Sequence, residues 1–203
     1  MNTCTYDVLV VGAGPAGSSA ARAAAGRGAR VMIVERKAKI GAPVRCAEYI
    51  PAPLLGQVER GREAVVQSVR GMRTILPGGE EKETAAPGFM IHRDQFDRAL
   101  AEAARRAGAE IRLSTRVLSR ENGKVMIGER GGYVSTVSAS VIIGADGPHS
   151  TVGRWIGCVN RNLMPALQVR VALPASMDHT EIYFHREIYG GYGWLFPKGQ
   201  EAN

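Results

Sequence analysis

The sequence has few cysteines and no long apolar run, and both absences exclude classes of protein. Its three cysteines, Cys4, Cys46 and Cys158, are odd in number and widely spaced. Such a set argues against a disulfide framework or a zinc site and is typical of a reducing cytosol, so we expect no metal. No apolar run approaches the ~20 residues of a membrane-spanning helix, and the start, Met1 to Tyr6, is polar. We expect a cytoplasmic protein, soluble or at most peripheral to a membrane.

The net charge is positive, but the basic residues do not form a run. The chain carries 26 Lys and Arg against 19 Asp and Glu, a formal charge of +7. No stripe of interleaved aromatic and basic residues accompanies this charge, so we expect no nucleic-acid binding. Attraction to anionic lipid headgroups or to cofactor phosphates is compatible with it.

Short apolar runs alternate with helical patterns, which predicts a parallel sheet covered by helices. The expected strands are residues 7–11, 30–35, 110–113 and 141–144. The expected helices are residues 15–27 and 94–108, with a short one ending near residue 155. Residues 115–138 have the pattern of a small β-meander.

Two stretches interrupt this alternation with Pro, Gly and period-two segments. Residues 168–173 and 181–185 are typical of antiparallel strands. The predicted fold is therefore α/β: a Rossmann-type parallel sheet with an inserted antiparallel β-rich layer. We assign residues 1–50 and 88–157 to the Rossmann-type domain. We assign residues 51–87 and 158–203 to the β-rich substrate or cap domain.

A glycine pattern follows the first expected strand and opens the first helix. Gly12, Gly14 and Gly17 form G-x-G-x-x-G, in which the glycines permit a tight turn, close approach of a pyrophosphate, and helix–strand packing. The phosphates would lie at the helix N-terminus, beside Ala16. Glu35 ends the second strand, eighteen residues after Gly17. At this position a carboxylate can accept hydrogen bonds from the ribose hydroxyls of a dinucleotide. The alternative is a tight turn with a surface glutamate. We predict nucleotide binding, with Arg36, the residue after Glu35, also at the site.

A second motif places an acid and a glycine, Asp146 and Gly147, after the buried strand 141–144. Ligands of α/β sheets bind at such strand ends. Residues 144–154 (GADGPHSTVGR) resemble the GADG-xx-S-x-V-R motif of the para-hydroxybenzoate hydroxylase-like flavoproteins. The resemblance favours FAD over NAD, whereas the alternative for Asp146 and Gly147 is an ordinary turn.

Two further segments narrow the resemblance. Residues 40–48 (IGAPVRCAE) are similar to the IG-x-PV-x-CGE loop of the geranylgeranyl reductase family, and residues 192–199 (YGWLFPKG) to its Y-x-W-x-FPKG segment. Ala47 departs from that pattern, because the family has glycine there. The resemblance also implies a further FAD-binding motif and a helical C-terminal region, which this sequence lacks, so we expect the C-terminal part of the fold to be missing.

The resemblance implies several contacts with the cofactor. It places Cys46 and Ala47 by the isoalloxazine ring, and it makes the Cys46 thiol the candidate catalytic group; the alternative is a small buried apolar residue. It implies that Arg93 reaches the flavin and that the backbone of Val117 meets the adenine. Without the resemblance, Arg93 would be a solvated charge and Val117 part of a strand.

Tyr192, Trp194 and Phe196 alternate at period two, which predicts an aromatic face on one strand. This face is either core or the wall of an apolar substrate cavity. The family resemblance implies an FAD-dependent reductase of isolated C=C bonds in a geranylgeranyl lipid or related isoprenoid. Its electron donor would be external, reduced ferredoxin or NAD(P)H. The alternatives are an aromatic monooxygenase on the same scaffold and a truncated, non-catalytic fragment that binds nucleotide weakly or not at all.

Overall fold

The computed structural model of the chain describes residues 3–203 and divides into two compact units. Unit 1 consists of Met1–Ala42 and Asp97–Leu163, and unit 2 of Pro43–Phe96 and Met164–Asn203. The chain therefore passes from unit 1 to unit 2 and back before it ends in unit 2. The assignment of one domain to a nucleotide and the other to a substrate stays a prediction.

Unit 1 contains a six-stranded sheet in the order β6-β2-β1-β9-β8-β7. Its strands are β1 (Thr3–Val11), β2 (Val31–Val34), β6 (Glu110–Arg112), β7 (Thr115–Glu121), β8 (Lys124–Glu129) and β9 (Val134–Gly144). Its helices are α1 (Pro15–Ala25), most of α3 (Arg93–Arg106) and α4 (Thr151–Trp155). Strands β6, β2, β1 and β9 are parallel, and β9, β8 and β7 continue as an antiparallel meander.

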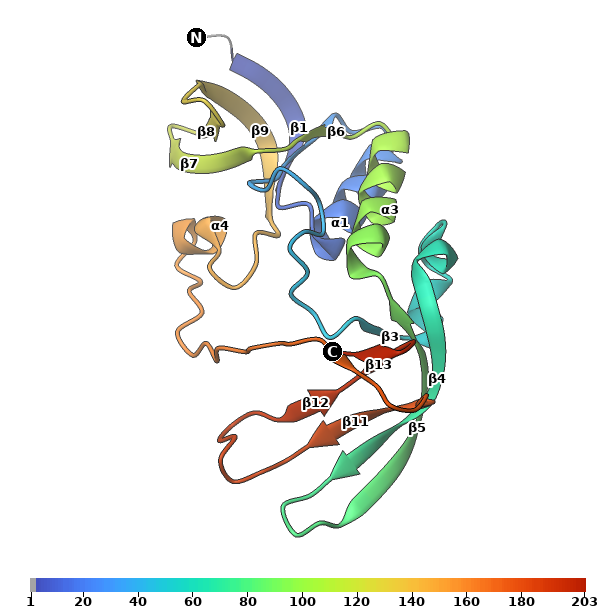
Figure 1. Ribbon diagram of the computed structural model, residues 1–203. Coiled ribbons are helices and arrows are strands. Elements are labelled where there is room, and N and C mark those ends of the chain that lie inside the picture. Colours follow the sequence, from blue (N-terminus) through green and yellow to red (C-terminus); the bar gives the residue numbers. More distant parts are fainter. Residues whose placement is uncertain (1–2) are drawn as a thin grey trace. The chain divides into compact units, whose positions relative to one another are not determined.

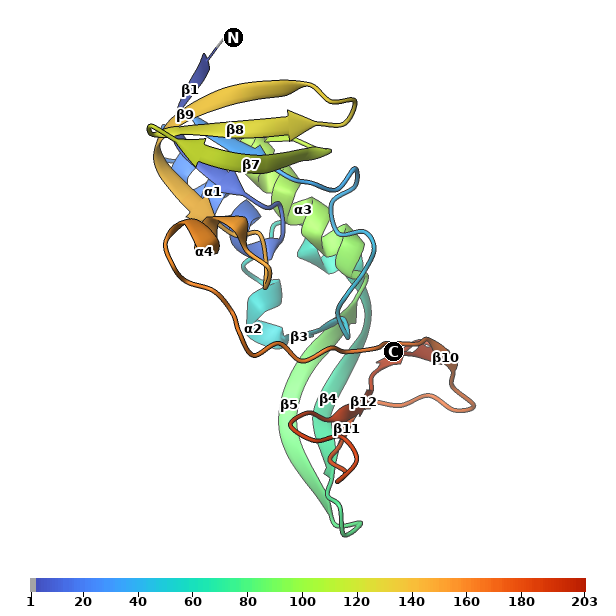
Figure 2. The same ribbon diagram turned by 90° about the vertical axis from the view of Figure 1, so that its left-hand side faces the viewer.

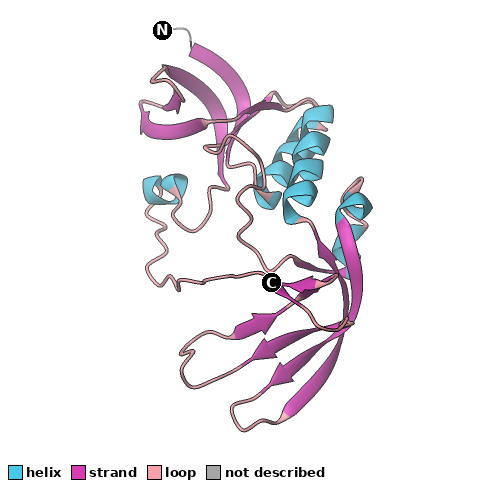
Figure 3. Ribbon diagram, in the orientation of Figure 1, coloured by secondary structure: helices cyan, strands magenta, loops and turns pink. Residues whose placement is uncertain are grey.

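The central parallel strand β2 is apolar throughout because both of its faces are covered. All four residues of β2 are buried. One face packs against α1 and α3 (Figures 1 and 3). Small alanines such as Ala21 and Ala104 allow these helices to approach closely. The other face packs against the meander (Figure 2). Val125 and Ile127 of the meander are fully buried. These layers confirm the predicted Rossmann-type arrangement.

Unit 2 is rich in β-structure and contains two sheets. The first has five strands in the order β12-β11-β4-β5-β3, and the second has three in the order β10-β14-β13. The strands of the first sheet are β3 (Tyr49–Pro51), β4 (Val65–Ile75), β5 (Glu81–Ile91), β11 (His179–Tyr183) and β12 (Gly193–Leu195). Those of the second are β10 (Val171–Ala172), β13 (Pro197–Lys198) and β14 (Glu201–Ala202). Two single turns, α2 (Ala52–Leu55) and the 3-10 helix η1 (Gly61–Ala64), precede the long β4–β5 hairpin.

Three details of unit 2 differ from the sequence prediction. Strand β11 is antiparallel to β12 but parallel to β4, because a long connection separates β4 from β11 in the chain. Of residues 168–173, only Val171 and Ala172 are in a strand. The aromatic segment is not one continuous strand: β12 ends at Leu195, and Pro197, which has no N–H to donate, begins β13 in the other sheet.

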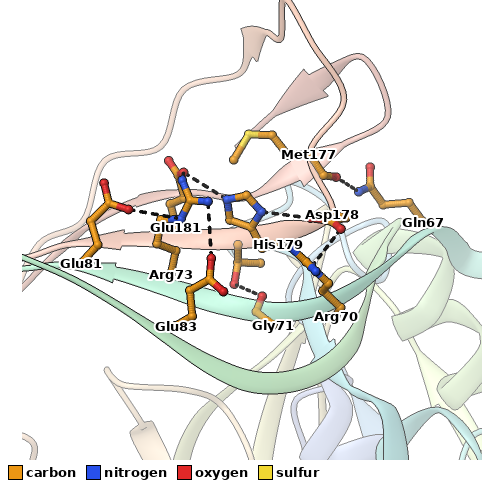
Figure 4. A network of polar contacts seen from close by, with 11 residues as sticks. Gln67, Arg70, Gly71, Arg73, Glu81, Glu83, Met177, Asp178, His179 and Glu181 are labelled. Atoms are coloured by element: carbon orange, nitrogen blue, oxygen red, sulfur yellow. Dashed lines mark hydrogen bonds and ion pairs between the residues drawn. The ribbon is translucent and has the colours of Figure 1, made fainter.

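A polar network bridges strands β4, β5 and β11 (Figure 4). Arg73 on β4 lies within 3.5–3.6 Å of Glu81 and Glu83 on β5 and of Glu181 on β11. His179 Nε2 lies 3.3 Å from the same Glu181 carboxylate. The guanidinium therefore joins three strands of one sheet across the hairpin.

Candidate functional site

The glycine turn of unit 1 has a separate structural reason for each glycine. Gly12 has φ of +102°, and a Cβ there would lie 2.3 Å from the carbonyl oxygen of Ala145. A Cβ on Gly17 would lie 1.9 Å from the carbonyl oxygen of Gly12. Gly14 precedes α1, and a Cβ there would have nothing within 4 Å. Two glycines thus permit packing, whereas Gly14 faces open space at the N-terminus of α1.

Glu35 connects the end of β2 to this turn. Its Oε2 accepts a hydrogen bond from the backbone N–H of Ala13 at 2.9 Å, and its Oε1 accepts one from the N–H of Lys37 at 2.9 Å. The carboxylate therefore fixes the turn as well as lying at the site, a second role that the sequence did not reveal. Each carboxylate oxygen retains a further acceptor position for a ligand hydroxyl.

Asp146 binds the start of the short helix α4, whose N-cap residue is Ser150. Its carboxylate accepts hydrogen bonds from the hydroxyl of Ser150 at 2.5 Å and from the backbone N–H of Thr151 at 2.6 Å. The Ser150 hydroxyl accepts in turn from the N–H of Gly153 at 2.7 Å. Gly147 follows with φ of +84°, a left-handed conformation that favours glycine. The GADG segment thus reverses the chain at the end of β9 and orders the loop there.

These residues surround one cavity of about 480 Å³ at the carboxyl ends of β1, β2 and β9. Its size is in the range of small-molecule sites. Six of its lining residues were predicted from the sequence: Gly12, Gly14, Glu35, Arg36, Asp146 and Gly147, and Val117 of β7 is a seventh. Ala16 and Gly17 lie in the first turn of α1 and do not line it.

The cavity suits an anionic ligand. Its acidic side chains are Glu35 and Asp146, and its basic side chains are Arg36, Lys37, Arg116 and Arg154. The first N–H groups of α1 have no partner within the helix and add positive potential beside Gly14. The sequence analysis did not identify Arg116 and Arg154 as site residues, although Arg154 closes the GADG motif and Arg116 adjoins Val117.

A second cavity, of about 580 Å³, lies within unit 2 and gathers the other predicted residues. Cys46 and Ala47 line one part of it, and Tyr192, Trp194 and Phe196 line another. Residues 166–168 complete the wall. The cavity is mostly apolar, and Arg45, an exposed residue, is its one charged side chain among the residues that the structure describes.

The aromatic residues of this cavity serve partly as core. Phe196 is buried with Val69 and Met90, whereas Tyr192 is exposed and its ring lies 6.3 Å from that of Trp194. Core and cavity wall were alternatives at the sequence level. In the structure one end of the aromatic series is core and the other is open to the cavity.

Arg93 begins α3, and its backbone N–H donates to Glu48 Oε1 at 2.9 Å. Glu48 itself was not predicted as a site residue, yet it is only 1% exposed and pairs with Lys198 Nζ at 2.5 Å. Burial raises the pKa of Glu48, but hydrogen bonds from Lys198, the Arg93 N–H and Asn203 together lower that pKa below its ordinary value. Glu48 lies in the 40–48 segment and Lys198 in the 192–199 segment, both of which resemble the geranylgeranyl reductase family. This resemblance was the only sequence signal that could have pointed to the two residues.

In the 40–48 loop, Ala47 stands where the geranylgeranyl reductase pattern has glycine. Ala47 is not among the described residues with positive φ, whereas Glu48 has φ of +69°. The left-handed residue is therefore the glutamate after Ala47, and the backbone accommodates the alanine without strain.

The parallel sheet, the glycine turn and the acid at the end of β2 define a dinucleotide-binding fold. A sequence model of the FAD dependent oxidoreductase family matches residues 7–147. The chain belongs to this family, and its cofactor is FAD.

Comparison with curated proteins confirms the expected resemblance to geranylgeranyl reductases. The chain is 39% identical to the digeranylgeranylglycerophospholipid reductase of Methanosarcina acetivorans over 96% of this chain and 52% of that protein. A geranylgeranyl bacteriochlorophyll reductase-like protein from Thermoplasma acidophilum has a solved structure with 33% identity and a TM-score of 0.82. That match covers 100% of this chain and 56% of the other. The chain thus spans about half the length of the relatives it matches.

The fold is shared with flavoproteins of other chemistry. A myxobacterial chondrochloren halogenase, an FAD-dependent enzyme, matches with a TM-score of 0.74 at 20% identity over 98% of this chain and 52% of that one. At this identity the match supports the fold alone.

Proposed function

We propose that the unit 1 cavity binds the ADP half of FAD. The pyrophosphate would lie at Gly14 and the N-terminus of α1, beside Ala16 and Gly17. The ribose would lie at Glu35, and the adenine near the backbone of Val117. The open space at Gly14 and the excess of basic side chains support this assignment.

We further propose that the protein reduces isolated C=C bonds of a polyprenyl group on a lipid. The observation that carries this proposal is 39% identity to a digeranylgeranylglycerophospholipid reductase over 96% of the chain. The unit 2 cavity supports it, because Tyr192, Trp194 and Phe196 provide the apolar wall that a hydrocarbon chain requires.

In this proposal the flavin, when bound and reduced, supplies a hydride to the double bond. Cys46 and Ala47 form the part of the cavity wall that faces the reacting carbons, and the Cys46 thiol is the candidate group for handling the accompanying proton. The aromatic residues exclude water and orient the chain of the substrate. Arg93 reaches the cofactor from the start of α3.

The proposed reaction consumes two electrons and two protons for each double bond. An external donor, reduced ferredoxin or NAD(P)H, would supply the electrons to the flavin. Delivery of a lipid also implies peripheral contact with a bilayer. The +7 charge and the exposed apolar side chains of Leu167 and Tyr189 support such contact. No helix among residues 3–203 is long and apolar enough to cross a membrane.

One observation favours a second function, an aromatic monooxygenase. Arg45 lines the unit 2 cavity, and a cation there would pair with the carboxylate of an aromatic acid. The segment from Tyr189 to Pro197 contains no basic side chain. Arg45, in the 40–48 loop, provides the basic side chain of the cavity. Arg45 would equally pair with the phosphate of a phospholipid headgroup.

The test incubates the purified protein anaerobically with FAD, dithionite and a geranylgeranyl phospholipid. We expect products heavier by two hydrogens for each double bond reduced, detected by mass spectrometry. Oxygen-dependent hydroxylation of an aromatic acid, without a reduced prenyl product, would move the assignment to the monooxygenase. Absence of a flavin absorption spectrum after gel filtration with excess FAD would indicate a non-catalytic fragment.

A further inference from the structure

A buried ion pair lies directly behind the Cys46–Ala47 turn. The side chains of Glu48 and Lys198 are 1% and 5% exposed, and they meet at 2.5 Å although they are 150 positions apart in the chain. Burying two charges is costly, and such a pair is weak evidence for stability in itself. Its best supported use is to fix one arrangement of the groups around it.

The contacts around the pair fix the turn residue by residue. The N–H of Glu48 donates to Cys46 Sγ at 3.3 Å. Asn203 Nδ2 donates to the carbonyl oxygen of Ala47 at 3.2 Å and to Glu48 Oε2 at 2.9 Å. Glu48 holds a left-handed conformation that is unfavourable for a residue with a Cβ. That conformation persists where surrounding contacts impose it, and here its carboxylate is anchored by three donors.

We propose that Glu48 and Lys198, with Asn203, are positioning residues that hold the Cys46 thiol and the Ala47 backbone at the wall of the unit 2 cavity. The ion pair joins the 40–48 loop to the 192–199 segment, which are two of the three segments that line this cavity. Cys46 and the aromatic residues are therefore placed by one buried contact. The positioning of Cys46 and Ala47 does not depend on the proposed function. Only the statement that Cys46 faces a flavin rests on the proposed function.

The test measures alkylation of all three cysteines, without added flavin, by mass spectrometry of labelled peptides. In Glu48→Ala we expect the rate at Cys46 to rise roughly tenfold, because the turn loses its anchor, while Cys4 and Cys158 react as in the wild type. Glu48→Gln keeps one acceptor oxygen, which can serve either the Arg93 N–H or the donors Lys198 and Asn203, and should give a smaller increase. Glu102→Gln, which weakens an exposed pair with Arg105 on α3, is the matched control and should change nothing.

An unchanged rate at Cys46 in folded Glu48→Ala overturns the proposal, and so does an equal increase at all three cysteines, which indicates general unfolding. If Glu48→Ala does not fold, Asn203→Ala provides the same comparison, because it removes the donor to Ala47 and leaves the ion pair. A second arm repeats the labelling with FAD. Protection of Cys46 by FAD supports its proposed contact with the cofactor, and lack of protection removes that contact without affecting the positioning result.

Discussion

The two units build their sites in different ways. In unit 1 the glycine turn, Glu35 and Asp146 each follow the end of a parallel strand, so they come together once the parallel sheet forms. In unit 2 the cavity is assembled from a loop at residues 44–47 and from segments near residues 167 and 194, and a buried ion pair joins two of them. Backbone topology therefore places one site, and side-chain electrostatics places the other.

Removal of the Lys198 charge should cause the largest loss of stability, and it tests whether the buried ion pair holds unit 2 together. Lys198→Met leaves Glu48 buried without its cation, and we expect a loss of about 3–5 kcal/mol in the free energy of unfolding. Urea unfolding followed by circular dichroism measures it. Arg70→Met, which removes an exposed pair with Asp178, is the control and should have no measurable effect. If Lys198→Met and Arg70→Met lower the free energy of unfolding equally, the buried ion pair has no special role, and the contrast drawn between the two units is wrong.

The same substitution should reverse the pH dependence of unit 2. The folded-state pKa of Glu48 is lowered, so its contribution to stability is present above the ordinary pKa of 4.5 and is lost as pH falls through the folded value. In Lys198→Met the strongest donor is gone and burial should raise that pKa above the ordinary value. Stability would then decline as pH rises through the region above 4.5. Urea midpoints between about pH 3 and pH 7 give both slopes.

Steric change should have the next largest effect, in unit 1. A Cβ at Gly17 would lie 1.9 Å from the backbone oxygen of Gly12, so Gly17→Ala forces the helix away from the strand. We expect a loss of about 3 kcal/mol, at the upper end for overpacking. Gly14→Ala is the matched control: its Cβ meets nothing within 4 Å, and the change in stability should stay within about 0.5 kcal/mol. A similar loss in both variants would contradict the distinct roles of the two glycines.

Most of unit 1 was predictable from the sequence because its signals are local. The apolar runs, the helix starts and the glycine turn each occupy neighbouring residues, and strand ends meet at one edge of a parallel sheet. For unit 2 the sequence predicted a β-rich layer, two antiparallel strands and an aromatic face, but not how the strands pair. The parallel pairing of β11 with β4 and the contact between Glu48 and Lys198 join residues that lie far apart in the chain, and no short pattern records them. The resemblance to the geranylgeranyl reductase family pointed to the 40–48 and 192–199 segments, but it did not predict that Glu48 and Lys198 form an ion pair.

Measurements of FAD binding should distinguish Gly14, which faces the proposed ligand, from Gly17, which permits packing. Gly14→Val leaves packing intact but places a branched side chain where the pyrophosphate approaches, so charge-assisted hydrogen bonds to the phosphates are lost. We expect FAD affinity to fall roughly 100-fold, with urea unfolding unchanged. Fluorescence titration with FAD measures the affinity. Retention of stoichiometric FAD by this variant would contradict the phosphate assignment.

The smallest expected effect concerns Glu35, which both holds the turn and faces the proposed ribose. Glu35→Gln keeps one acceptor and should weaken FAD binding about tenfold, whereas Glu35→Lys keeps none and should weaken it more. A ribose contact and a contact with the turn are separated by comparing ADP with 2′-deoxy-ADP in isothermal titrations. If Glu35 binds the 2′-hydroxyl, the wild type prefers ADP and Glu35→Gln loses most of that preference. If it acts only through the N–H of Ala13, both ligands lose the same affinity, and Glu35 belongs to the turn alone.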